Sequence, residues 1–327
     1  MAFIGFDLDE TLGRFVGPFY HLLFLMPWVT YSTSNKGLEP FPLPEDVRKK
    51  LDIAFQKFIP CVAANETTQQ VLRPGILKIM KKLSELKDQG QVSAISVYSN
   101  NGSLACLLFA TALIEELLGK KNLFCNHIDW YNPIRSKEIT PGHPGQAFKT
   151  VETLQRSFLD TRCGPYKTLR DIPIEKLYFF DDIIHSNILA RIGNERYFLV
   201  NSYKVDVPSK EFHTCFDEAM KFAQLDTDEE YLKYIAPFLS QYKLPALYEN
   251  IQILMDQADK YTVWKNERYI DDTEDILARI DSMLSLKSYG NNYFPVVDGG
   301  RRRKGRRVTV KRRTKIRKTR YRRHRKN

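Results

Sequence analysis

Residues 1–12 read MAFIGFDLDETL, a short apolar run that ends in two carboxylates and a hydroxyl. The run predicts a buried strand, because strands of parallel sheets read as nearly continuous apolar segments. Ligands of α/β proteins bind at the carboxyl ends of such strands, so Asp7, Asp9 and Thr11 are expected at a binding site. Two carboxylates this close are costly to bury together, and a divalent cation such as Mg²⁺, which prefers oxygen ligands, would remove that cost. The alternative is an acidic turn without a ligand.

Two later segments repeat this pattern of an apolar run that ends in polar side chains. Residues 92–102 read VSAISVYSNNG, a β-branched run followed by Ser99. Residues 177–187 read LYFFDDIIHSN, an aromatic run followed by Asp181 and Asp182. Because the carboxyl ends of parallel strands meet at one edge of a sheet, these polar groups are expected close to the first pair of carboxylates. The strands alternate with helical segments, which predicts an α/β fold with a doubly wound parallel sheet.

The three segments, in this order, resemble the haloacid dehalogenase superfamily. That family has a first motif Asp-x-Asp-x-Thr/Val, a second motif with Ser or Thr at a strand end, and a fourth motif with an acidic pair after a strand. The matching residues are Asp7, Asp9 and Thr11 for the first motif, Ser99 for the second, and Asp181 with Asp182 for the fourth. The resemblance covers residues 1–205 and implies a Rossmann-like core.

The third motif of this family is a lone lysine before the last of these strands. Lys167 fits best, because its spacing to the acidic pair resembles that of phosphatases acting on the C-terminal domain of RNA polymerase II, which also carry DLDETL. Lys149 is the alternative. Two features depart from that phosphatase group: it usually has Thr where Ser99 stands, and a Ser-rich stretch where residues 183–185 read Ile-Ile-His.

The resemblance implies a magnesium-dependent phosphatase that acts through an aspartyl-phosphate. In that mechanism Asp7 attacks phosphorus, and Asp9 protonates the leaving oxygen and then activates water. Lys167 and Ser99 hold the phosphoryl oxygens, and Thr11 orients Asp9 or donates to the loop.

The same resemblance implies the ligands of the Mg²⁺ ion. They are the Asp7 carboxylate, the backbone carbonyl of Asp9, and Asp181 or Asp182. His185 is interpreted as a residue at the start of a helix, in preference to a substrate contact. The substrate class stays open between a phosphoprotein, a nucleic-acid end and a small phosphate ester. The alternative function is a nucleic-acid-binding or structural protein on the same scaffold with weak or no catalysis.

The last residues, 301–327, carry 17 Lys or Arg and no acidic residue. The chain has 50 Lys and Arg against 39 Asp and Glu, so outside this tail 33 basic residues face 39 acidic ones. The net charge of +11 therefore belongs to the tail. Such a block predicts disorder over 299–327 and binding to DNA or RNA through phosphate contacts. A nuclear localisation signal and an anionic membrane surface are alternatives, and basic termini of virion proteins are an analogy.

Four parts are predicted along the chain. Residues 1–205 form the catalytic core, with a small helical, cap-like insertion at 13–71. A helical extension follows at 206–298, and the disordered basic tail occupies 299–327. The extension is expected to contain four amphipathic helices, at 210–224, 228–241, 248–260 and 271–286.

The insertion contains the most apolar stretch of the chain, residues 15–29. This stretch is too short to cross a bilayer and follows the first strand, so neither a transmembrane segment nor a secretory signal is predicted. The insertion either closes over small substrates or packs against the core and leaves the site open to a macromolecule.

The five cysteines are Cys61, Cys106, Cys125, Cys163 and Cys215. They are scattered and form no Cys-x-x-Cys pair, which argues against a disulfide framework or a zinc site and for a reducing compartment. Cys125 and His127 are close in sequence and are interpreted as core or loop residues. The expected location is intracellular, either nuclear or associated with nucleic acid, including the interior of a virion, and not secreted.

Overall fold

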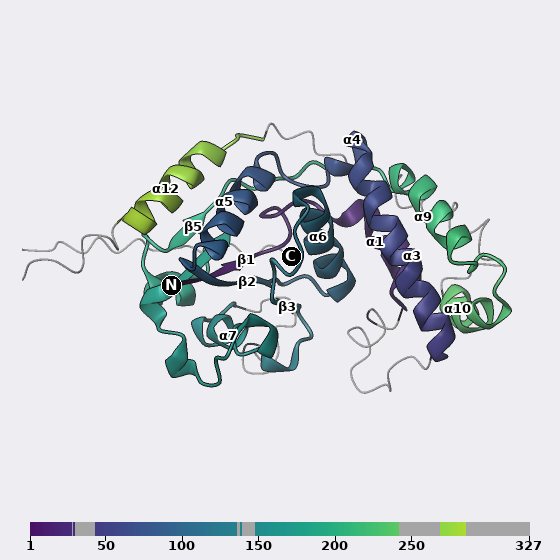
Figure 1. Cartoon of the computed structure of the whole chain (residues 1–327), viewed down its shortest axis with the longest axis horizontal. Coiled ribbons are helices and arrows are strands. Elements are labelled where there is room, and N and C mark those ends of the chain that lie inside the picture. Colours follow the sequence, from purple (N-terminus) through teal and green to yellow (C-terminus); the bar gives the residue numbers. More distant parts are fainter. Residues whose placement is uncertain (28, 30–42, 136–137, 139–147, 242–268, 286–327) are drawn as a thin grey trace, which may run out of the picture. The chain divides into compact units, whose positions relative to one another are not determined.

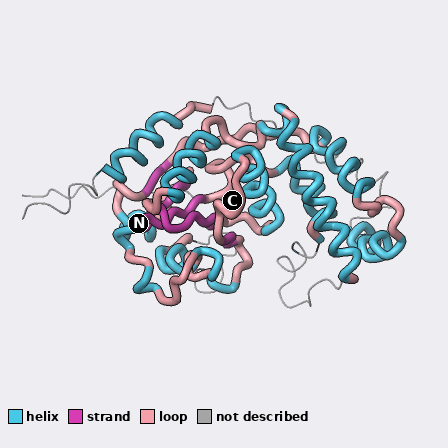
Figure 2. The backbone as a smooth tube through the Cα atoms, in the orientation of Figure 1, coloured by secondary structure: helices cyan, strands magenta, loops and turns pink. Residues whose placement is uncertain are grey.

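The computed structural model describes residues 1–27, 29, 43–135, 138, 148–241 and 269–285. The chain divides into two units, 1–287 and 288–327, and every described residue belongs to the first. Figure 1 shows its elements along the chain, and Figure 2 shows the strands gathered among helices.

A five-stranded, all-parallel sheet forms the centre of this unit. Its strands are β1 (Ala2–Phe6), β2 (Val92–Tyr98), β3 (Asn126–Ile128), β4 (Leu177–Asp181) and β5 (Tyr197–Leu199). They lie in the order β3-β2-β1-β4-β5. The chain therefore builds the sheet outward from β1 in one direction and then, with β4 and β5, in the other. The adjacent carboxyl ends of β1 and β4 are where such sheets place their ligands.

The side chains of β1 alternate between the two faces of the sheet, and both faces are buried. Ile4 and Phe6 belong to one hydrophobic cluster and Phe3 to another. Gly5 points to the same face as Phe3, where a Cβ atom would lie 2.5 Å from Leu154 Cδ1. Glycine at this position lets the neighbouring helix approach the strand closely.

Helices cover both faces. One face carries α5 (Ile76–Asp88) and α6 (Leu104–Leu118), whose apolar residues share the cluster of Ile4. The other carries α7 (Val151–Arg156) and α8 (Ser186–Ile192), which share the cluster of Phe3. Figure 1 shows α5 and α6 on one side of the strands and α7 on the other. The α/β class with a parallel sheet is therefore confirmed.

The insertion contributes three described helices: α1 (Val16–Leu25), α3 (Glu45–Ala64) and α4 (Glu66–Gln69). Both α1 and α3 pack against α6 of the core. The sequence allows the insertion either to close over the site or to pack against the core. The contacts of α1 and α3 with α6 are packing against the core. Residues 28 and 30–42 of the insertion lie outside the described residues.

The extension contributes α9 (Lys210–Phe222), α10 (Glu229–Gln241) and α12 (Thr273–Ser285), so three of its four predicted helices are confirmed. The fourth, at 248–260, lies outside the described residues. Helix α9 packs along α3, and α12 packs along α5, where Lys82 Nζ lies 2.7 Å from Asp281 Oδ1.

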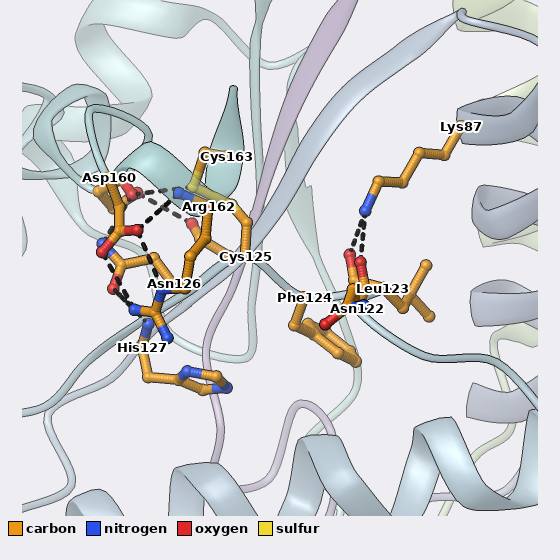
Figure 3. Close-up of a disulfide and its surroundings, with 12 residues drawn as sticks. Lys87, Asn122, Leu123, Phe124, Cys125, Asn126, His127, Asp160, Arg162 and Cys163 are labelled. Atoms are coloured by element: carbon orange, nitrogen blue, oxygen red, sulfur yellow. Dashed lines mark hydrogen bonds and ion pairs between the residues drawn. A yellow bond between two sulfur atoms is a disulfide. The ribbon is translucent and has the colours of Figure 1, made fainter. Parts of the chain in front are cut away.

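Two disulfides overturn the expectation of unpaired cysteines. Cys61 of α3 pairs with Cys215 of α9, and Cys125 pairs with Cys163 (Figure 3). The fifth, Cys106, is buried and unpaired. The partners lie 154 and 38 residues apart in the sequence, so the fold brings together cysteines whose spacing did not predict a pairing. The inference from the cysteines to a reducing compartment loses its basis.

The second disulfide ties a surface turn to the edge strand of the sheet. Cys125 directly precedes β3, and Cys163 ends the turn that carries Arg162 (Figure 3). Arg162 pairs with Asp160, with its Nε atom 2.9 Å from Asp160 Oδ1. His127, on β3, contacts Thr111 Oγ1 at 2.9 Å through its Nε2 atom, as a packed residue of the core would.

Within the apolar stretch at 15–29, residues Val16–Leu25 form the ten-residue helix α1. Among the described residues, no helix combines the length and the apolar character needed to cross a membrane. This agrees with the sequence prediction for that stretch.

Candidate functional site

Polar side chains from three strand ends meet at the carboxyl edge of the sheet. Asp7 follows β1, Ser99 follows β2, and Asp181 is the last residue of β4. The backbone N–H of Asp7 donates to the carbonyl of Phe180 at 2.9 Å, which fixes β1 against β4 beside the site. Carboxylate oxygens of Asp7, Asp181 and Asp182 all lie within 4.8 Å of one another.

Lys149 lies between two of these carboxylates. Its Nζ atom is 2.7 Å from Asp7 Oδ1 and 2.7 Å from Asp181 Oδ2, and its side chain is only 1% exposed. The two negative charges outweigh the effect of burial and raise the pKa of Lys149. The lysine is therefore held as a cation.

Of the two candidate lysines, the structure places Lys149 beside the carboxylates and Lys167, the first choice from the sequence, away from them. Lys167 is exposed, and its backbone N–H donates to Asp171 Oδ2 at 2.9 Å. Lys149 lies two residues before the start of α7, a helix that connects parallel strands and so begins at the carboxyl edge of the sheet. Lys167 follows α7, on the way to the start of β4. The position of each lysine relative to α7 therefore separates the two candidates, and the spacing to the acidic pair does not reveal this position.

The carboxylates around Lys149 have different pKa shifts. Burial raises the pKa of Asp7, and the charge of Asp181 raises it further, against the opposing effect of Lys149. Burial and then the charges of Asp7 and Asp181 raise the pKa of Asp182 to about 7. The pKa of Asp181 is lowered despite its burial, because Lys149 and His185 favour its charged form. The site thus holds three carboxyl groups around one ammonium, and their mutual repulsion opposes full ionisation.

Asp9 is turned back over the site by a tight loop. The N–H of Leu12 donates to the carbonyl of Leu8 at 2.8 Å, and Glu10 has a φ of 64°, which is uncommon outside glycine. Asp9 Oδ2 accepts a hydrogen bond of 2.7 Å from Asn101 Nδ2. Burial is the main cause that raises the pKa of Asp9 to about 6. This carboxyl group can exchange a proton near neutral pH.

Thr11 orients the Asp182 carboxylate and not Asp9. Its hydroxyl donates to Asp182 Oδ1 at 3.2 Å and accepts from the backbone N–H of Asp182 at 3.0 Å. The predicted link from Thr11 to Asp9 is replaced by this reciprocal pair, which connects the loop after β1 to the end of β4.

Three further side chains complete the surroundings. The hydroxyl of Ser99 accepts from the backbone N–H of Asn101 at 3.1 Å, and its proximity to Asp7 opposes the rise in the pKa of that carboxyl. His185 occupies the expected position at the start of α8, but its Nε2 atom also lies 3.3 Å from Asp181 Oδ2. Sequence reasoning gave Asn101 no role of its own, although its place two residues after Ser99, in the polar segment that follows β2, was a usable signal.

The three clustered carboxylates fit a small divalent cation. They supply hard oxygen ligands from two adjacent strand ends, and Thr11 fixes one of them in place. Asp7 belongs both to this cluster and to the pair with Lys149, so one carboxylate would be shared between a metal and a fixed cation.

Comparison with known proteins finds no family model, no curated protein and no solved structure that matches this chain.

Proposed function

We propose that this chain is a magnesium-dependent phosphate-ester hydrolase of the haloacid dehalogenase type. The observation that carries the proposal is the position of Asp7, which shares one site with Lys149 and with the acidic pair Asp181–Asp182. Asp9 stands two residues further on with a pKa of about 6. In this proposal Asp7 is the nucleophile, Lys149 the fixed cation, the acidic pair part of the metal site and Asp9 the proton donor.

The reaction divides into two displacements. In the first, the Asp7 carboxylate forms a bond to phosphorus while the bond to the leaving oxygen breaks, and Asp9 gives that oxygen a proton. In the second, Asp9 takes a proton from water, whose oxygen attacks phosphorus and releases Asp7. The hydrogen bond from Asn101 keeps Asp9 near the leaving group in both steps.

Lys149 and Ser99 stabilise the charge of the phosphoryl group. The ammonium of Lys149, held between Asp7 and Asp181, is fixed before substrate binds and needs no reorganisation. The Ser99 hydroxyl adds a donor from the neighbouring strand end. Asp7, Asp181 and Asp182 would hold Mg²⁺, which when bound offsets the repulsion between phosphate and carboxylate.

Hydrolysis of an aryl phosphate tests this function directly. Wild type should show turnover with Mg²⁺ that is lost with a chelator and in Asp7→Asn. Asp88→Asn is a matched control, because Asp88 is an exposed carboxylate paired with Lys120 on the surface. A folded wild type without turnover in Mg²⁺, or an Asp7→Asn variant as active as wild type, would contradict the proposal.

The second part of the proposal concerns residues 301–327, whose 17 basic residues would tether the enzyme to DNA or RNA. The same tail supports the alternative function, a nucleic-acid-binding or structural protein with little catalysis. Deletion of 301–327 should abolish salt-sensitive DNA binding and leave aryl phosphate turnover unchanged. Binding that survives the deletion would move the nucleic-acid site into residues 1–300.

A further inference from the structure

A second buried ion pair, Arg135–Glu138, lies next to the proposed phosphate site. The Nε atom of Arg135 is 2.8 Å from Glu138 Oε2, and each side chain is 1% exposed. Arg135 ends a short 3₁₀ helix (Pro133–Arg135) that follows β3. Neither residue touches Asp7, Lys149 or the acidic pair in any contact seen among the described residues.

Arg135 is bonded to the loop that carries Ser99. Its Nη1 atom donates to the carbonyl of Ser99 at 2.6 Å, and its Nη2 atom donates to Asn100 Oδ1 at 2.6 Å. The guanidinium also lies over the ring of Tyr98, 5.0 Å from its centre. The planar fork thus fixes the backbone of the residue that supplies a phosphate-binding hydroxyl.

Glu138 is bonded to the residue that follows Lys149. Its Oε1 atom accepts from the hydroxyl of Thr150 at 2.8 Å and from the backbone N–H of Thr150 at 3.1 Å. The hydroxyl of Tyr98 donates to the same oxygen. The carboxylate therefore fixes the backbone at the point where the chain turns from Lys149 into α7.

The cost of burying charge shows what this pair is for. An ion pair taken out of water is often no more stable than apolar side chains of similar volume, so stability alone does not explain it. Apolar side chains would not bond to the carbonyl of Ser99 and the N–H of Thr150. Only a fixed donor fork and a fixed acceptor join these two loops at a set spacing.

We propose that Arg135 and Glu138 are positioning residues, which hold Ser99 and Lys149 at the separation that binds the phosphoryl group. The consequence for turnover rests on the proposed phosphatase function. Two loops that carry phosphate-binding groups are joined through one buried bridge, so a shift of either end changes both. Support of this kind around a metal site is worth about 10- to 100-fold in activity or affinity.

The test replaces the bridge without leaving a buried charge unpaired. The double variant Arg135→Met/Glu138→Leu keeps similar volume, and the matched control is Arg191→Met/Glu152→Leu, which removes a half-exposed pair with the same 2.8 Å separation. The readouts are kcat and KM for an aryl phosphate, the affinity for inorganic phosphate with Mg²⁺, and Tm. The bridge variant should lose about 10- to 100-fold in kcat and bind phosphate more weakly. Its Tm should fall by several degrees, because the carbonyl of Ser99 and the N–H of Thr150 lose their buried partners. The control should match wild type throughout.

A single variant decides the matter if the double variant does not fold. Arg135→Lys keeps the charge opposite Glu138 but loses the fork to Ser99 and Asn100, so kcat and phosphate affinity should fall while Tm stays near wild type. Folded bridge variants with wild-type kcat and phosphate affinity would overturn the proposal.

Failure of the proposed function is seen separately. A wild type that binds phosphate without turning over substrate would end the phosphatase proposal, and the phosphate affinities of the variants would still decide the positioning role. A wild type that neither turns over substrate nor binds phosphate would overturn both.

Discussion

Two buried ionic clusters lie at the carboxyl edge of this sheet, and they differ in charge balance. In the Arg135–Glu138 pair, one guanidinium faces one carboxylate, and the remaining polar atoms bond to Ser99, Asn100 and Thr150. Around Lys149, carboxylate oxygens crowd from two strand ends. We call the Arg135–Glu138 pair the balanced cluster, because its one cation faces one carboxylate. We call Lys149 with Asp7, Asp181 and Asp182 the unbalanced cluster, because one ammonium faces three carboxyl groups.

The pKa shifts express this imbalance. The pKa of Asp182 is raised to about 7 by burial and by its two acidic neighbours, and that of Asp7 is raised as well. Charge of one sign crowded into a buried site is unfavourable unless a ligand compensates it, which supports the proposed Mg²⁺ position. A balanced pair with matched hydrogen bonds indicates support. Ion pairs of the same length can thus have different roles.

The largest expected effect comes from Asp9, the proposed acid beside the cluster around Lys149. Asp9→Asn keeps the shape of the side chain but removes the proton, so kcat should fall about 10²- to 10⁴-fold. Inorganic phosphate should bind as in wild type, because Asp9 is hydrogen-bonded to Asn101 and does not contact the Lys149 pair. Steady-state kinetics and calorimetry measure the two quantities. Unchanged kcat would remove Asp9 from the acid–base role.

The next effect separates the two candidate lysines. Lys149→Met should lower kcat about 10²- to 10³-fold, because a fixed positive charge beside the phosphoryl group is lost. Lys167→Met should leave kcat unchanged, because Lys167 is exposed. Both are measured with Mg²⁺, which keeps the Asp7 and Asp181 charges compensated in the first variant. The opposite ranking would return the third motif to Lys167.

Metal binding and charge removal test the balance itself. At 100 times its Kd, Mg²⁺ should stabilise wild type by about 2.7 kcal/mol and raise Tm by roughly 5 °C. Asp182→Asn should lose this shift. With chelator, the same variant should be more stable than wild type by on the order of 1 kcal/mol, because it removes a crowded and partly exposed charge.

Glu138→Gln should have the opposite effect on stability to Asp182→Asn, and Tm is measured in the same experiment. It removes one charge of the balanced cluster, so Tm should fall with or without Mg²⁺. A chelated Asp182→Asn less stable than chelated wild type, or a Glu138→Gln as stable as wild type, would break the distinction between the two clusters.

The sequence predicted the unbalanced cluster better than the balanced one. Strands that end in Asp7, Ser99 and the acidic pair can be read from apolar runs and turn signals, because local hydrophobic pattern and position in the sheet agree. Arg135 and Glu138 stand three residues apart in a polar segment, PIRSKE. Such residues are usually solvated, and only the packing of three loops reveals that these are buried.

Long-range connections explain the errors. Lys149 could have been chosen by topology, since the residues before a crossover helix lie at the carboxyl edge, but spacing to the acidic pair favoured Lys167. The pairings Cys61–Cys215 and Cys125–Cys163 depend on helix packing and on the sheet edge, and no sequence spacing encodes either.

The smallest expected effect concerns the surface beside the unbalanced cluster. Ile183 and Ile184 directly follow the acidic pair and are 60% and 55% exposed. The side chains of Arg135 and Glu138 are each only 1% exposed. Apolar side chains at the mouth of a site gain by covering the leaving group of an apolar ester. Ile183→Ser with Ile184→Ser should raise KM for naphthyl phosphate about threefold to tenfold and leave KM for a small aliphatic phosphate unchanged. Ile53→Ser, at an exposed isoleucine of α3, is the control. An equal rise in KM for both substrates would show that the two isoleucines act by holding Asp181 and Asp182 in position and not by contacting an apolar leaving group.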